Sequence, residues 1–106
     1  MDNYEESARQ MHRNGNNCAN SVYGAFVSVN EHATKAPKPR SDGGKCGAVL
    51  AAEQLIREMN LGDPSDFEKD FKERYGSVLC AEIIRKNGRI CNDLVGYAAA
   101  RVEEMR

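Results

Sequence analysis

Four cysteines, Cys18, Cys46, Cys80 and Cys91, are the residues of this chain best suited to chemistry. A cysteine thiolate is both a nucleophile and a soft metal ligand, so four of them can form a redox or metal-cluster site. No two are spaced as C-x-x-C, the pattern of thioredoxin-like motifs and zinc ribbons. A shared site must therefore be assembled by the tertiary fold.

The elements that must position these cysteines are helices. Hydrophobic residues recur at helical spacing, no segment alternates as a strand does, and Gly or Asn stands at the breaks. The helical segments are 2–12, 18–29, 45–60, 64–75, 78–87 and 91–106. The sequence predicts an all-α fold, a small bundle of about five short helices, in a single domain spanning 1–106.

Polar residues at the segment starts predict how the helices are capped. Asn16 or Asn17 can cap the second helix, and Ser77 can cap the fifth. Ser65 and Glu68 have the spacing of a capping box. The polar stretch 30–43, which contains two prolines, is expected to be an exposed and mobile loop.

Each cysteine is predicted to lie at or near a helix N-terminus. Unpaired backbone N–H groups and the helix dipole favour negative charge there, which stabilises the thiolate over the thiol. Redox cysteines and metal-ligating cysteines both need the thiolate. Each cysteine also begins an apolar stripe, so packing in the core as a small hydrophobic residue is the alternative interpretation.

Charge and hydropathy narrow the class of protein. The 106 residues contain 15 Lys and Arg against 16 Asp and Glu, so no basic field would attract nucleic acid. No long apolar run and no secretory signal pattern is present, so we expect a cytoplasmic protein that does not enter a membrane. A reducing cytoplasm favours metal binding or transient redox chemistry over structural disulfides.

The surroundings of the cysteines resemble a known family. The stretches NCANSVYGAF, GGKCGAVLAA, SVLCAEI and RICNDLVGYAA resemble the redox-active C_GCAxxG_C_C family, whose name describes four cysteines in this order. The resemblance runs from about Asn17 to Ala100 and leaves the predicted N-terminal helix, 1–15, outside. Cys46 and Gly47 match the start of the family motif, whereas Ala51 stands where that motif has glycine.

This resemblance implies redox activity at the cysteines. A similar arrangement occurs in the non-haem iron domain of split-Soret cytochromes, which implies that Cys18, Cys46, Cys80 and Cys91 bind a 2Fe–2S or 4Fe–4S cluster. No C-x-x-C-H haem attachment sequence is present, so the haem part of that comparison does not apply.

The leading hypothesis is therefore electron transfer or redox sensing, with all four cysteines as redox-active thiols and cluster ligands and an unidentified redox protein as partner. Three alternatives stay open: a metal-free dithiol/disulfide couple such as Cys80 with Cys91, a structural zinc site, and a helical interaction module with packed cysteines. The pattern also leaves open whether the chain is an enzyme and whether two copies share one site.

Other candidate residues receive simpler interpretations. His12 and His32 could pair with a cysteine nucleophile, although both are expected to be solvated. Glu53 and Glu82 could act as proton donors near the cysteines, although both are expected to face water. The basic segment 35–40 is expected to be a solvated loop.

Overall fold

The computed structural model describes residues 3–106, which form six helices and no β-strand. The helices are α1 (Tyr4–Arg13), α2 (Cys18–Ala25), α3 (Gly47–Glu58), α4 (Pro64–Tyr75), α5 (Cys80–Asn87) and α6 (Cys91–Met105). The all-α prediction is confirmed, but the number of helices is six and not about five. Gly15 and Gly88 have φ angles of 104° and 83°, so neither residue can continue a right-handed helix, and α1 and α5 end before them.

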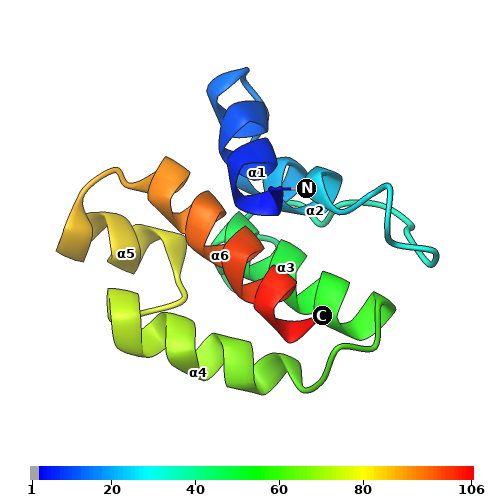
Figure 1. Cartoon of the computed structure of the whole chain (residues 1–106). Coiled ribbons are helices and arrows are strands. Elements are labelled where there is room, and N and C mark those ends of the chain that lie inside the picture. Colours follow the sequence, from blue (N-terminus) through cyan, green and yellow to red (C-terminus); the bar gives the residue numbers. More distant parts are fainter. Residues whose placement is uncertain (1–2) are drawn as a thin grey trace.

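Helix α3 lies in the middle of the molecule (Figure 1). It contacts α2, α4 and α6, while α1 packs on α2 and α6, and α5 contacts α4. No helix in the described part of the chain is long and apolar enough to cross a membrane.

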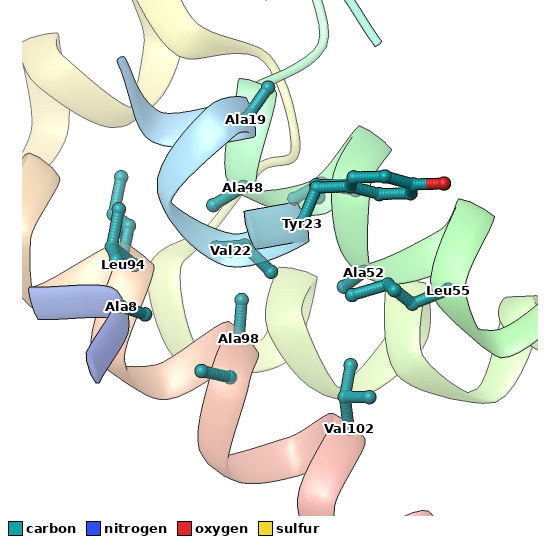
Figure 2. Close-up of a cluster of buried hydrophobic side chains, with 14 of the residues drawn as sticks. Ala8, Ala19, Val22, Tyr23, Ala48, Ala52, Leu55, Leu94, Ala98 and Val102 are labelled. Carbon is teal, nitrogen blue, oxygen red and sulfur yellow. The ribbon is translucent and has the colours of Figure 1, made fainter. Parts of the chain in front are cut away.

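Small side chains form much of the core between α2, α3 and α6. Figure 2 shows them facing one another across the helix interfaces, where short side chains let helix backbones approach closely. The labelled side chains without solvent exposure are Ala8, Ala19, Val22, Ala48, Ala52, Leu55, Ala98 and Val102. On one side Tyr4 stacks on Phe26 with ring centroids 4.5 Å apart, which joins α1 to the end of α2.

The helix starts agree only in part with the predicted caps. The Asn17 side chain accepts a hydrogen bond from the Asn20 amide (2.7 Å), as predicted. Helix α4 is instead capped by Asp63, whose carboxylate accepts from the Ser65 amide (2.9 Å), so the predicted capping box does not form. Ser77 lies three residues before α5, where its hydroxyl accepts from the Leu79 amide (3.0 Å).

The carboxylate of one α3 residue holds the first part of the loop after α2. Helix α2 ends at Ala25, so the predicted helical stripe to Val29 is too long, and the chain has no further helix before Gly47. One carboxylate, that of Glu58, accepts hydrogen bonds from Tyr23 Oη (2.7 Å), Asn30 Nδ2 (2.8 Å), Thr34 Oγ1 (2.8 Å) and Gln54 Nε2 (2.9 Å). These bonds fix the first part of the loop to α3.

Candidate functional site

The four cysteines, which are 11 or more residues apart in sequence, line one cavity of about 250 Å³. We call it the cysteine cavity. Cys18, Cys80 and Cys91 are the first residues of α2, α5 and α6, and Cys46 is the N-cap of α3. The tertiary fold therefore brings four helix N-termini to one place.

Main-chain hydrogen bonds hold Cys46 and Cys80 beside each other. The Cys46 amide donates to the Val78 carbonyl oxygen (2.8 Å), and the Cys80 amide donates to the Gly44 carbonyl oxygen (3.0 Å). Lys45 and Leu79 form an isolated antiparallel bridge between these two bonds. The segments leading into α3 and α5 are thus paired like two short strands, which sets the spacing of their cysteines.

The position of Cys91 depends on the contact between α1 and α6. Its neighbour Asn92 accepts hydrogen bonds from Arg9 Nη1 at both the main-chain oxygen and Oδ1 (3.2 Å each). The Asn92 amide group also donates to the Arg9 carbonyl oxygen (3.2 Å). The N-terminal helix, which lies outside the family resemblance, therefore fixes the first turn of α6.

Burial and the proximity of other thiols make Cys18 and Cys46 weaker acids than an ordinary cysteine. Burial, followed by the neighbouring Cys46 and Cys91, raises the pKa of Cys18 to about 12, and the Cys91 side chain also interacts with Cys18 directly. Burial raises the pKa of Cys46 to about 11, although the Ala48 and Val49 amides act in the opposite direction. The predicted stabilisation of thiolates is thus outweighed for these two cysteines, because several sulfur atoms share a desolvated space.

Four thiols are a suitable donor set for an iron–sulfur cluster or for zinc. Within residues 3–106, however, no three His, Cys, Asp or Glu side chains stand in an arrangement that would hold a metal ion. A shared metal would therefore require the thiols to move toward one another. Metal binding would also have to displace the thiol protons, which the raised pKa values of Cys18 and Cys46 make costly.

Three cationic or basic side chains also line the cysteine cavity: His12, Arg40 and Arg89. His12 is half-buried, and its Nδ1 lies 3.3 Å from Asn92 Nδ2, so it is solvated only in part. Arg40 belongs to the segment expected to be a solvated loop. No spacing rule relates these residues to the cysteines, although Arg89 stands only two positions before Cys91.

The two glutamates considered from sequence do not line the cavity. Glu82 accepts a hydrogen bond from Ser77 Oγ (2.6 Å). Glu53 is only 6% exposed, so the expectation that it faces water is wrong. Its carboxylate lies 3.5 Å from Lys45 Nζ, which also contacts Glu68 (3.3 Å). Burial and Glu68 raise the pKa of Glu53 to about 7, against the opposing effect of Lys45.

Ala51, the residue that departs from the family motif, lies in the core. It is fully buried in α3 and does not line the cysteine cavity. Comparisons of the chain with protein-family models, curated proteins and solved structures found no match. The four-cysteine resemblance therefore stays a prediction.

Proposed function

We propose that this chain is a redox-active protein whose four cysteines bind an iron–sulfur cluster for electron transfer or redox sensing. The observation that carries the proposal is that Cys18, Cys46, Cys80 and Cys91 line one cavity although they belong to four different helices. Free cysteines that merely fill a core have no reason to gather at one cavity wall, whereas cluster ligands must.

Each part of the chain has a role in this proposal. The four thiols would hold the cluster, which supplies one-electron transfer when bound. The bridge between Lys45 and Leu79 would keep two ligands in register, and Arg9 with Asn92 would position a third. We further propose that the protein works in a reducing compartment such as the cytoplasm and exchanges electrons with a partner protein.

The test is a metal and sulfide analysis of the full chain prepared without oxygen, together with its absorbance spectrum. Bound iron, inorganic sulfide and visible charge-transfer bands are expected. Each single Cys→Ser variant should lose most of this signal. Ser21→Ala is the matched control, because Ser21 is buried in α2 near Cys18 but does not line the cavity.

Some outcomes would overturn the cluster. A colourless chain that takes up no iron on anaerobic reconstitution with iron and sulfide excludes it. Zinc bound at one atom per chain, without iron, would instead indicate a structural zinc site. A chain whose oligomeric state and partner binding survive replacement of all four cysteines, with no lost cofactor, would indicate an interaction module.

The proximity of Cys91 to Cys18, which contributes to the raised pKa of Cys18, supports a second candidate, a metal-free dithiol/disulfide couple. It favours this pair over Cys80 with Cys91, the pair nearest in sequence. In such a reaction each thiol loses a proton, one S–S bond forms, and the two electrons reduce a disulfide of a partner protein to two thiols. Peptide mapping after mild oxidation of the metal-free chain would show a Cys18–Cys91 disulfide if this candidate is correct.

A further inference from the structure

The wall of the cysteine cavity carries positive charge without a carboxylate to balance it. Arg40 and Arg89 line the cavity, and no Asp or Glu of residues 3–106 does so. Neither arginine forms an ion pair with another described residue. This contrast is local, because the chain as a whole has a net charge of −1.

A second groove differs from the cysteine cavity because carboxylates line it together with arginines. Its arginines stand beside the carboxylates of Glu5 and Asp93. There Arg9 pairs with Glu5 (3.0 Å) and with Asp93 (3.3 Å). Arg74 of that groove lies over the rings of Tyr75 and Tyr97 and has no ion pair with another described residue, but the groove has as many carboxylates as arginines. Among the described residues, the cysteine cavity has two arginines and no carboxylate.

The helix N-termini at the cavity provide an independent observation. Asn3, Asn17 and Asp63 cap α1, α2 and α4, but no side-chain hydrogen bond caps α3, α5 or α6. These three helices are the ones at whose starts Cys46, Cys80 and Cys91 lie, Cys46 as the N-cap of α3 and the other two as first helical residues. Helix N-termini carry partial positive charge, which suits an anion. The Ala48 and Val49 amides of α3 interact with the Cys46 thiol, and the Cys80 amide donates to Gly44, so the dipoles of these helices contribute more than free N–H groups do.

The acidic residues in the first turns of these helices do not supply that anion. Asp93 of α6 pairs with Arg9, and Glu82 of α5 accepts from Ser77 Oγ. Both turn to partners outside the cavity wall. Helix α3 has no acidic residue in its first turn.

We propose that the cysteine cavity binds an anionic group, the carboxylate or phosphate of a small-molecule reactant, through Arg40 and Arg89 and the uncapped helix N-termini. A cavity of about 250 Å³ has room for a small anion. The bound group would lie beside the four thiols. This site goes beyond the redox assignment because it specifies the charge of the molecule that reaches the sulfur atoms, and it does not require a cluster.

The test is a titration of the reduced full chain with inorganic phosphate at constant ionic strength. Binding is monitored through the chemical shifts of the backbone amides in NMR spectra. The chain is used both as purified without oxygen and after treatment with a chelator. Saturable binding is expected, with shifts concentrated at residues of the cavity wall. Arg40→Gln combined with Arg89→Gln should weaken binding at least about tenfold, because two charge-assisted hydrogen bonds are lost.

Arg57→Gln is the matched control, since Arg57 is exposed on α3, lies outside the cavity and has no ion-pair partner among the described residues. It removes one of the two positive charges that the double variant removes, and it should leave binding unchanged. Circular dichroism of each variant confirms that it is folded. An equal loss of binding in Arg57→Gln, or no saturable binding of any anion tested, overturns the proposal.

A second titration separates the sources of the anionic group. If an oligoglutamate peptide binds in an arginine-dependent way and phosphate does not, a partner protein supplies the group and the small-molecule assignment is wrong. The redox proposal is judged separately. A colourless chain that binds phosphate would retain the anion site and lose the cluster, and an iron-containing chain without anion binding would do the reverse.

Discussion

Gly47 and Ala19 approach each other so closely that a Cβ atom on Gly47 would lie 3.0 Å from the Ala19 backbone nitrogen. The same Cβ would lie 3.2 Å from Pro39 Cβ. Gly47 therefore lets the start of α2, the loop and the start of α3 meet around the cysteine cavity. The glycine after the second cysteine is explained by this contact.

Gly47→Ala should destabilise the fold by about 1–3 kcal/mol, because a backbone atom must move to admit the methyl group. Urea unfolding followed by circular dichroism measures the change. Gly24→Ala is the matched helical control, since its Cβ would meet only the flexible end of Met11. It should be neutral or stabilising by up to about 1 kcal/mol, from the better helix propensity of alanine. Equal stability of the two variants would show that the Gly47 contact is not tight.

The raised pKa values of Cys18 and Cys46 predict slow alkylation. With pKa values of about 12 and about 11 in place of 9.0, the thiolate populations at pH 8 fall about a thousandfold and a hundredfold. Both residues of the reduced, metal-free chain should therefore react with iodoacetamide at least about tenfold more slowly than in the urea-unfolded chain, because the higher nucleophilicity of a thiolate of raised pKa offsets part of the loss in population. Peptide mass spectrometry gives the rates. Unfolded-like rates would contradict the burial of these thiols.

The raised pKa of Glu53 predicts that the stability of the fold depends on pH. Its pKa in the folded state, about 7, exceeds the ordinary value of 4.5, so the folded state holds this proton more tightly. The resulting contribution is fully present below pH 4.5 and is lost as the pH rises through about 7. Glu68 works in the other direction, since the hydrogen bond with Glu53 and the proximity of Lys45 lower its pKa.

Glu53→Gln cannot lose that proton and should flatten the profile. Between pH 5 and 8, its free energy of unfolding should fall by about 2 kcal/mol less than that of the wild type. Urea unfolding at a series of pH values tests this. Glu103→Gln, an exposed change on α6, should retain the wild-type slope. Parallel profiles for all three chains would show that Glu53 is ionised throughout.

Glu58 is expected to hold the loop that leads to the cavity. Glu58→Gln replaces one carboxylate oxygen by an amide nitrogen, which cannot accept the bonds from Thr34 and Gln54, and should cost about 1–3 kcal/mol. The loop should then be cleaved faster by trypsin after Lys35. Glu31→Gln in the same loop is exposed and serves as the control. Unchanged cleavage would mean that the loop is fixed by other contacts.

The helices could be predicted from sequence because their signals are local. Apolar spacing gave the six segments, and Gly76, with a φ angle of 84°, ends α4 where expected. The capping box failed because α4 begins at Pro64 with Asp63 as its cap, and Glu68 turns instead to Lys45, which is distant in sequence. The burial of Glu53 also depends on tertiary packing, which places its carboxylate beside Lys45.

The candidate site could be predicted only as a set of residue types. Cysteines at helix starts are a local pattern, but their convergence depends on how four helices pack. The positions of Arg40 and His12 in the cavity wall depend on the loop and on α1, which no spacing of cysteines encodes. The raised pKa values of Cys18 and Cys46 cannot be predicted from a helix N-terminus alone, because they depend on burial and on the neighbouring thiols.

The bridge beside Cys46 and Cys80 consists of main-chain atoms alone. Evolution can therefore exchange the side chains of Leu79 and its neighbour Val78 while these hydrogen bonds persist. In divergent descendants of this chain, the distance between the second and third cysteines should outlast the identities of the residues around them. Distant relatives should accordingly be easier to recognise from the backbone geometry at this bridge than from their amino-acid sequences.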